Sequence, residues 1–286
     1  MPRVDLHAHL LPSLDDGPQD IQESLAMARA AAQDGTDIIV ATPHQRDVML
    51  NASVEKVRDL AGLINEALAR EAVPGSRRAR VLMGMENHIE PDLPDWVDQG
   101  KALTLNRTRF ILAEPPFTAY PPYVDDVLSR LSVKRLVPVI AHPERSAVLQ
   151  RNPRKVLDLV ERGMVIQVTA GSFLGAHGPA AQRAAVSFLR RGLVHIVASD
   201  MHHLSGHRTP GLQAAFERVT ELAGEEQARL LFEVNPEEII EDRRPRQSQV
   251  EAGEAPRRWW QVRLPWLRPG EVRDLLTPAR WRGRGG

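Results

Sequence analysis

Short apolar runs alternate with longer helical patterns along the first 200 residues of the chain. Short apolar runs bounded by turn residues indicate buried strands, whereas apolar positions that recur with the helical period indicate amphipathic helices. Seven strands are predicted at Val4–His9, Asp37–His44, Arg80–His88, Phe110–Pro115, Val137–His142, Val165–Thr169 and Val194–Asp200. Helices are predicted between them at Asp20–Gln33, Ser53–Arg70, Tyr123–Leu131, Pro153–Arg162 and Pro179–Arg191.

The order of these elements predicts an α/β fold with a parallel sheet. Gly35, Gly163 and Gly192 stand where three of the predicted helices should end, in line with the preference for glycine after a helix. Strands that alternate with helices run parallel, and seven such units favour a closed or nearly closed barrel. An open doubly wound sheet is the alternative. No dinucleotide-binding or P-loop motif occurs in the sequence.

Potential metal ligands follow every predicted strand except the sixth. The first strand carries Asp5, His7 and His9, which should converge because residues two apart share a face of a strand. In a parallel barrel the carboxyl ends of all strands gather at one face, where active sites are built. The ligand positions are His7, His9, His44, Glu86, Glu114, His142, Asp200 and His202, with Asp15 or Asp16 added from the turn after the first strand.

This set is too large for a single metal ion. A lone histidine at a strand end is most often an ordinary hydrogen-bonded side chain, but a buried cluster of this kind is costly without a cation. One divalent ion takes about four to six protein and water ligands, so nine donors indicate two or three ions. Glu86 and Glu114 are the natural bridging ligands, because a carboxylate can use both oxygens.

Two arginines stand close to these ligands in the sequence, Arg145 in HPER and Arg208 in SGHRTP. Each alone is as easily a surface or carboxylate-paired side chain. Beside metal ligands, they suit a phosphoryl group, whose oxygens accept forked hydrogen bonds from guanidinium groups. His88 with Glu90 is interpreted as a loop pair, with a role in supporting the metal ligands as the alternative. His195 is expected at the opposite end of the barrel. His177, His203 and His207 are expected in solvated loops, with a substrate contact as the alternative for His207.

The composition narrows the chemistry further. The 286 residues are 42% hydrophobic, with no apolar run long enough to span a membrane, and they contain no cysteine. Disulfides, thiolate zinc sites and cysteine nucleophiles are therefore excluded. The histidine motif begins at residue 5 and leaves no room for a signal peptide before it, so we expect a cytoplasmic protein.

The net charge of zero hides an uneven distribution. Residues 242–286 contain 11 arginines and 5 acidic residues, a net charge of +6, and four of the five tryptophans, so residues 1–241 carry −6. We expect a catalytic barrel over 1–241 and a basic, Trp-rich extension over 242–286. That extension is open to several interpretations: a disordered tail, a segment that packs on the barrel, a contact with an acidic partner, or peripheral binding to an anionic membrane.

Together the segments DLHAHLLPSLDDG, ATPH, GMEN, AEPP, AHPER and ASDMH resemble the PHP superfamily of metal-dependent phosphoesterases. The segments LPSLDDGP, HPER, QVTAGSFLGAHG and RTPGL resemble the CpsB/CapC-type tyrosine-protein phosphatases of capsule and exopolysaccharide operons, over roughly residues 3–240. Two positions depart from that pattern. Gln45 stands where the family often has a second histidine, and Thr169 or its neighbour replaces an asparagine of the sixth strand.

The resemblance implies a distorted (β/α)7 TIM-like barrel (the PHP fold) with a three-metal site, usually of manganese, with iron, zinc or magnesium as alternatives. It selects Asp16 over Asp15 as the ninth metal ligand and gives Arg145 and Arg208 phosphate-binding roles. It implies hydrolysis of phosphotyrosine in a protein, with a membrane-associated bacterial tyrosine kinase as the expected partner. The nucleophile expected at such a site is a metal-bound water that loses its proton near neutral pH.

Other functions remain open from the sequence. A PHP-type phosphatase of a small phosphomonoester, such as histidinol phosphate or a nucleotide, would use the same core, and a non-catalytic metal-binding regulatory module would keep fewer ligands. A nucleic-acid partner is not expected, because the region 1–241 is acidic. An amidohydrolase commonly uses a lysine at the fourth strand, where this chain has Glu114. The loop PPFTAYPPY offers Phe117, Tyr120 and Tyr123 either as a clamp for an aromatic ring or as a stiff self-packed loop.

Overall fold

The protein's structure, a computed structural model, describes residues 1–70 and 77–247. Its strands are all parallel and form two ladders, in the orders β1-β2-β3 and β4-β5-β6-β7-β8. The strands are β1 (Val4–Ala8), β2 (Ile38–Ala41), β3 (Arg80–Met83), β4 (Asn87–His88), β5 (Phe110–Glu114), β6 (Val137–Ile140), β7 (Val165–Thr169) and β8 (Ile196–Ala198).

The two ladders join into one barrel. The predicted strand at 80–88 is broken into β3, which pairs with β2, and β4, which pairs with β5, so one stretch of chain connects the ladders. On the other side β8 meets β1, where the backbone N–H of Asp200 donates to the His7 carbonyl at 2.9 Å and that of His9 to the Met201 carbonyl at 2.8 Å. The predicted barrel is therefore confirmed, with its irregularity at Glu86, which forms an isolated bridge with His44.

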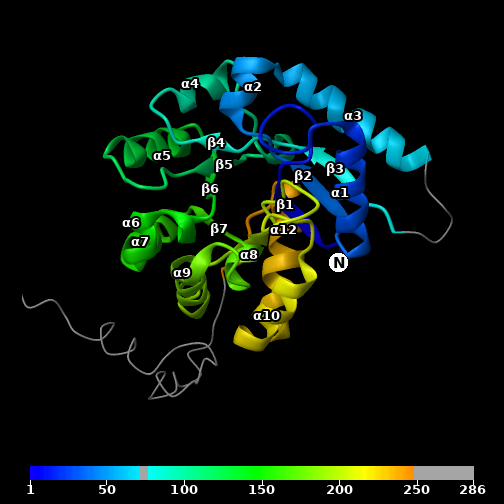
Figure 1. Ribbon diagram of the computed structural model, residues 1–286. Helices are drawn as coiled ribbons and strands as arrows, with labels where there is room; N and C mark the ends of the chain where they lie inside the picture. The colour runs from blue at the N-terminus through cyan, green and yellow to red at the C-terminus, as the bar shows by residue number, and fades with distance from the viewer. Residues whose placement is uncertain (71–76, 248–286) are drawn as a thin grey trace, which may run out of the picture. The chain divides into compact units, whose positions relative to one another are not determined.

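Helices lie outside the strands (Figure 1), with α1 and α3 beside β1–β3 and α5, α7 and α9 beside β5–β8. The five predicted helices are present as α1 (Ile21–Gln33), α3 (Val54–Arg70), α5 (Tyr123–Val133), α7 (Pro153–Glu161) and α9 (Gly178–Arg190). Further helices are α2 (Gln45–Asn51), α4 (Leu93–Asp98), α6 (Ala147–Arg151), α8 (Ala170–Phe173), α10 (Gln213–Ala223), α11 (Glu225–Arg229) and α12 (Asn235–Ile240). Short helical turns span Leu105–Arg107, Pro143–Arg145 and Leu230–Val234.

The ends of α1 show how local chemistry sets these boundaries. The Asp20 carboxylate accepts hydrogen bonds from the backbone N–H groups of Gln22 and Glu23, which have no partner inside the helix. After the last turn, Gly35 adopts φ +105°, a left-handed conformation that glycine reaches without strain. The chain can then turn directly into β2, so that α1 forms the crossover between the parallel strands β1 and β2.

Apolar side chains fill the barrel below the strand ends. Phe110 and Leu112 of β5 pack with Val40 of β2 and Leu6 of β1, and Ile239 of α12 packs against the same cluster. Each of these five side chains is fully buried or nearly so. Truncating one large core side chain costs roughly 2–5 kcal/mol, so this layer is a rigid base for the polar residues at the carboxyl ends.

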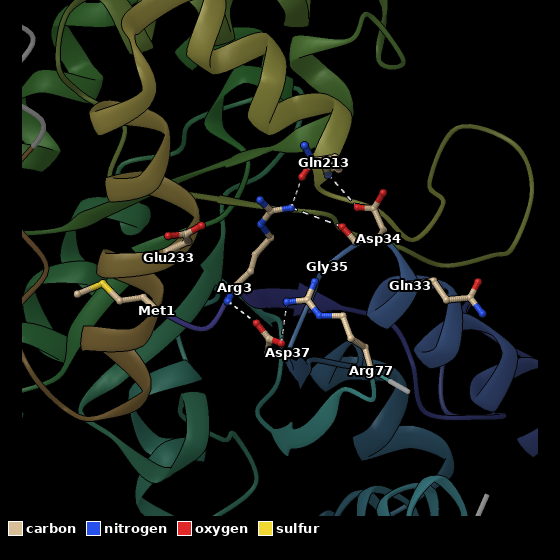
Figure 2. A pocket seen from close by; sticks show the side chains of 9 residues that line it. All are labelled: Met1, Arg3, Gln33, Asp34, Gly35, Asp37, Arg77, Gln213 and Glu233. Atoms are coloured by element: carbon tan, nitrogen blue, oxygen red, sulfur yellow. Dashed lines mark hydrogen bonds and ion pairs between the residues drawn. The ribbon is translucent and has the colours of Figure 1, made fainter. Parts of the chain in front are cut away.

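A polar pocket of about 290 Å³ lies at the amino-terminal end of the barrel (Figure 2). Several of its polar groups bond to one another: an Arg3 guanidinium nitrogen donates to Gln213 Oε1 at 2.7 Å, and Arg77 pairs with Asp37. Asp34 accepts hydrogen bonds from the backbone N–H of Gln213 at the start of α10. These bonds tie α10 to β1 and to the α1–β2 loop. The pocket lies away from the ligand residues at the opposite strand ends, and Asp34, Asp37 and Arg77 each have a structural partner there.

The beginning of the predicted extension contacts the barrel. Asp242 accepts from the backbone N–H of Arg109 at 2.8 Å, and the backbone N–H of Arg246 donates to Asn235 Oδ1 at 2.8 Å. Residues 248–286, which include four of the five tryptophans, lie outside the described residues. Within the described ranges, no helix combines the length and apolar character that crossing a membrane requires.

Candidate metal centre

His7 and His9 point into the same space at the carboxyl end of β1, with their Nε2 atoms 3.2 Å apart. Asp5, which was expected to join them, does not. Its carboxylate accepts hydrogen bonds from the backbone N–H of Ser199, at 3.0 Å, and from the Ser199 hydroxyl. The register of β1 shifts between Asp5 and Ala8, so the simple alternation of the strand is interrupted there. Asp5 therefore fastens β1 to β8 beneath the site.

Glu86 lies at the centre of the cluster. Its Oε1 is 2.9 Å from Nε2 of His142 and 3.3 Å from Nε2 of His7. Its Oε2 is 3.0 Å from Nδ1 of His44 and 3.3 Å from Nε2 of His9. Burial by itself raises the pKa of this carboxyl group, but the charge of His7, the hydrogen bond from His142 and the close approach of His44 outweigh it and hold the pKa well below its usual range.

Asp16 and Asp200 complete the cluster on two sides. Asp200 Oδ1 lies 3.5 Å from Nε2 of His7 and 3.7 Å from Nε2 of His9, and both carboxylate and imidazoles are buried. Asp16 Oδ1 lies 3.1 Å from Nε2 of His202 and 3.5 Å from Nε2 of His44, and its side chain is about half exposed. The structure thus brings together side chains from both ends of the chain.

Four overlapping groups have donor atoms within 4.8 Å of one another, the spacing that a shared ion requires. They are His9, Asp16, His44 and His202; His7, Glu86 and His142; His7, His9 and Asp200; and His44, His88 and Glu114. All nine predicted positions belong to these groups. The interpretation of His88 and Glu90 as a pair is wrong, because His88 Nε2 lies 2.9 Å from Glu114 Oε2 while Glu90 pairs with Arg46.

Asp15 has a role beyond the turn that was predicted for it. One oxygen does accept from the backbone N–H of Gly17 at 3.0 Å, as a turn residue would. The other oxygen lies 2.6 Å from Nδ1 of His9 and accepts from the backbone N–H of His44 at 3.0 Å. A carboxylate on Nδ1 leaves Nε2 free for a metal ion and makes the imidazole a better ligand.

Two more histidines are oriented through the same ring nitrogen by different acceptors. His7 Nδ1 lies 3.2 Å from the amide oxygen of Gln167, and His202 Nδ1 lies 2.9 Å from the backbone carbonyl of Asp200. In each case the proton belongs on Nδ1, because a carbonyl oxygen only accepts. Gln167 was not predicted, although it stands on the one strand that lacks a ligand. The three histidines therefore present Nε2 to the cluster.

The electrostatics of the cluster favour positive charge. Burial lowers the pKa of His9, but the charge and hydrogen bond of Asp15 overcome it and raise the pKa to about 9. Burial acts likewise on His44, but the nearby carboxylates of Asp16 and Glu86 outweigh it and raise the pKa of His44 to about 11. Protons held this strongly compete with a divalent cation for the same imidazole nitrogens.

Unsatisfied buried atoms in the donor set also favour a metal ion. Within the described part of the chain, Glu86 Oε2 and His44 Nδ1 are buried without a well-aligned hydrogen bond, although they lie 3.0 Å apart. Buried polar atoms in native proteins almost always have partners. Imidazole nitrogens and carboxylate oxygens together are typical ligands of borderline divalent metals such as manganese, iron and zinc.

Two residues of the cluster have a strained backbone. His142, after β6, has φ +31° and ψ +54°, and Asp200, after β8, has φ +53°. The left-handed region is costly for residues other than glycine and is often used at functional sites. The backbone N–H of His142 donates to Gln167 Oε1 at 3.1 Å, so Gln167 supports both His7 and His142.

Both predicted arginines reach the cluster. Arg145 pairs with Asp200, and Arg208 donates to Asp16 Oδ2 at 2.8 Å and approaches Nε2 of His202 to 2.6 Å. Their side chains are each about one-fifth exposed, so they lie between the buried cluster and solvent. Guanidinium groups placed there can meet an anion that enters the site.

Glu144 is a buried residue of the HPER segment that the sequence interpretation did not single out. Its Oε1 accepts from the backbone N–H of Thr169 at 2.9 Å and from the Ser172 hydroxyl at 2.7 Å. Burial raises the pKa of Glu144. These bonds hold the loop of Arg145 against the end of β7, at one of the two positions that depart from the family pattern. The other, Gln45, is fully buried and donates to the sulfur of Met49.

His177 lies closer to the site than predicted. It is partly buried, and within the described residues its Nε2 has no hydrogen-bond partner. The centroid of its ring lies 5.9 Å from that of the His207 ring. Burial and the charge of Arg145 lower the pKa of His177 to about 4, so it is neutral at physiological pH.

The family model described as "Capsular polysaccharide synthesis, CpsB/CapC" matches residues 3–241. The chain belongs to the CpsB/CapC family. Among relatives of this CpsB/CapC protein, tyrosine-protein phosphatase YwqE of Bacillus subtilis is 36% identical over 70% of this chain and 78% of its own. Tyrosine-protein phosphatase CpsB of Streptococcus pneumoniae is 31% identical over 84% of this chain and 98% of its own.

Solved structures agree with this assignment. A crystal structure from work on YwqE and CpsB, described as "unique metal-dependent tyrosine phosphatases", aligns with a TM-score of 0.77 and 33% identity, over 85% of this chain and 96% of that one. A dihydropyrimidinase of Brevibacillus agri aligns with a TM-score of 0.50 at 12% identity, over 88% of this chain and 73% of that one. The second likeness concerns the barrel fold alone.

Proposed function

We propose that this CpsB/CapC protein is a metal-dependent tyrosine-protein phosphatase that hydrolyses phosphotyrosine without a cysteine nucleophile. The observation that carries the proposal is the cluster of buried imidazoles and carboxylates with Arg145 and Arg208 beside it. The sequence has no cysteine, so a thiolate route is excluded. The relatives named above as tyrosine-protein phosphatases support the choice of substrate.

The metal ligands in this proposal are the nine clustered residues, which suffice for three ions. Bound divalent ions, with manganese preferred over iron, zinc and magnesium, supply Lewis-acid polarisation of the phosphoryl group and an activated water. The protein orients its donors for this purpose: Asp15, Gln167 and the Asp200 carbonyl fix the protons of three histidines on Nδ1. The ligands are His7, His9, Asp16, His44, Glu86, Glu114, His142, Asp200 and His202.

Arg145 and Arg208 bind the phosphoryl oxygens of the substrate. Arg145 already contacts the Asp200 carboxylate, and Arg208 contacts that of Asp16. These contacts hold both guanidinium groups between the buried cluster and solvent. Donors fixed in advance stabilise negative charge on the transferring phosphoryl group without further reorganisation. The leaving group from phosphotyrosine is a phenolate, which departs with less need for a proton than an alkoxide does.

The natural substrate in this proposal is a tyrosine-phosphorylated protein of capsule or exopolysaccharide synthesis, and specifically a membrane-associated bacterial tyrosine kinase. The family description, capsular polysaccharide synthesis, supports this choice. In this proposal the enzyme acts on the kinase in the cytoplasm. Incubating the autophosphorylated kinase with the purified protein tests the pair: we expect loss of phosphotyrosine, and a kinase that keeps its label would reject this partner.

The activity itself is tested by reconstitution. Protein stripped with a chelator is loaded separately with manganese, iron, zinc or magnesium and assayed on a phosphotyrosine peptide, histidinol phosphate and a nucleoside monophosphate. We expect metal-dependent turnover that is fastest on the peptide. Faster turnover of a small phosphomonoester would replace the proposed substrate, and no turnover of any ester would reject an enzyme.

Matched variants connect that activity to the cluster. We expect His142→Ala and Arg145→Ala to abolish or severely reduce turnover. Arg154→Ala removes an arginine that is 81% exposed on α7 and should behave as wild type. Full activity in His142→Ala would reject the proposed metal centre.

A further inference from the structure

Phe117 is a large apolar side chain that remains 41% exposed beside the metal cluster. Its ring is nearly parallel to that of His142, with an interplanar angle of 6° and 5.5 Å between the centroids. The guanidinium carbon of Arg145 lies 5.2 Å from the centroid of the same ring. An aromatic surface thus stands against both a proposed metal ligand and a proposed phosphate-binding arginine.

The backbone holds Phe117 in this position. Its carbonyl accepts from the N–H of Ala147 at 2.7 Å, and the neighbouring Pro116 carbonyl accepts from the Ser146 hydroxyl at 3.2 Å. Ala147 and Ser146 directly follow Arg145 in the chain. The loop after β5 is therefore attached to the segment that carries the arginine, which holds the backbones of Phe117 and Arg145 close together.

The other two aromatic residues of the loop are engaged differently. The Tyr120 hydroxyl donates to Asp125 at 3.2 Å, the Lys155 ammonium lies 4.9 Å from its ring centroid, and the ring packs against the apolar core. Tyr123 begins α5 and is 37% exposed. Among the ring contacts found in the described residues, Phe117 is the aromatic residue of this loop that meets the cluster.

We propose that Phe117 determines the preference for aryl phosphates by packing against the substrate's aromatic ring while Arg145 binds its phosphoryl group. In phosphotyrosine one oxygen joins the phosphorus to the ring, so an arginine and an aromatic side chain in contact match the two parts of the group. Aromatic pairs gain attraction in addition to the burial of apolar area. An alkyl phosphate, such as phosphoserine, offers no ring and gains nothing from Phe117. This inference rests on the proposed function and specifies how that site selects its substrate.

The test compares Phe117→Leu, which is apolar without a ring, with Phe117→Tyr, which keeps one. Turnover is measured on phenyl phosphate, a phosphotyrosine peptide and glycerol phosphate. For Phe117→Leu we expect kcat/KM to fall about tenfold on both aryl esters, mostly through KM, with glycerol phosphate changed less than about twofold. Phe117→Tyr should retain the wild-type ratio of kcat/KM on the aryl esters to kcat/KM on glycerol phosphate. Leu50→Ala, at a residue 80% exposed on α2, is the control.

Two outcomes would overturn the inference. An equal loss on aryl and alkyl esters would mean that Phe117 only supports His142 and Arg145, and an unchanged ratio would mean that the ring is not used. Calorimetry on metal-loaded protein measures the affinities for phenylphosphonate and methylphosphonate. Their ratio reports the preference for an aromatic ring without any turnover. If the wild type binds both but hydrolyses no phosphotyrosine, the proposed function fails while the role of Phe117 is still decided. Equal metal content in all variants excludes damage to the cluster.

Discussion

The amide oxygen of Gln167 lies 3.2 Å from Nδ1 of His7, and both side chains are fully buried. The same oxygen accepts the backbone N–H of His142 at 3.1 Å, which identifies it as oxygen because an amide nitrogen could not accept that bond. His7 must therefore carry its proton on Nδ1 and present Nε2 to the cluster. A neutral residue on a strand without ligands thus orients a ligand of another strand.

Gln167→Leu should weaken metal binding about 10-fold to 100-fold, the usual effect of removing a partner that orients a ligand. His7 would be free to rotate or change tautomer, and the N–H of His142 would lose its acceptor. Competition with a fluorescent chelator measures the affinity. Gln167→Glu keeps an acceptor oxygen and should bind metal better than the leucine variant. Equal affinity in wild type and Gln167→Leu would contradict this role.

Asp15→Ala should reduce metal affinity by a similar factor and also lower thermal stability. The substitution removes the carboxylate from Nδ1 of His9 and leaves the backbone N–H groups of His44 and Gly17 without their acceptor. Asp15→Asn retains an acceptor oxygen without the charge. Its metal affinity and melting temperature should therefore lie between those of the wild type and of Asp15→Ala. Affinity and melting temperature are read on the same preparations. If only stability changed, Asp15 would be a turn residue alone.

Apparent metal affinity should increase with pH between 7 and 9. Asp15 raises the pKa of His9 to about 9, so His9 is protonated at pH 7 and must lose the proton on Nε2 before that nitrogen can bind a cation. Each proton displaced makes affinity rise about tenfold per pH unit until the pKa of that histidine is passed, and His44, with a pKa of about 11, adds to the rise across this range. Calorimetry in two buffers of different ionisation enthalpy counts the protons released. A pH-independent affinity would contradict the prediction.

Acid should destabilise the fold through His195, far from the cluster. Burial lowers the pKa of His195 to about 4, and its Nδ1 accepts the backbone N–H of Ile166 at 3.2 Å, so it is neutral when folded. The unfolded chain binds the proton near pH 6.5, so stability is complete above pH 6.5 and is lost as pH falls toward 4. The loss amounts to about 3 kcal/mol. Urea unfolding of wild type and His195→Asn at pH 4.5 and 7 measures this loss of stability. The variant should lose less stability in acid than the wild type. An equal loss would show that His195 is not responsible.

Glu144→Ala should lower the free energy of unfolding by about 2–4 kcal/mol. It leaves the Thr169 N–H and the Ser172 hydroxyl buried without an acceptor, and each such group costs roughly 1–3 kcal/mol. Glu144→Gln keeps the amide oxygen as acceptor and should lose much less. Urea unfolding monitored by circular dichroism gives both values. An alanine variant as stable as wild type would show that the loop finds other partners.

Much of the fold followed from local pattern. The strand at Val165–Thr169 and the helix at Ser53–Arg70 appear almost unchanged as β7 and α3, because burial imposes the period of each element on its sequence. The break between β3 and β4 was missed. It arises where Glu86 turns toward His44, a contact between different strands that no periodicity within one strand encodes.

The sequence by itself determined which residues stand at the strand ends and therefore which donor atoms meet at one face. Parallel strands carry their carboxyl ends to the same place whatever the details of packing. Only the tertiary structure decided how those donors are oriented: Asp5 turned to Ser199, Asp15 to His9, and Gln167 to His7. Gln167 and His7 are 160 positions apart, and Asp5 and Ser199 are 194 apart. Such pairings depend on the closed barrel and the bulge in β1, which set distances between elements that residue patterns along the chain do not contain.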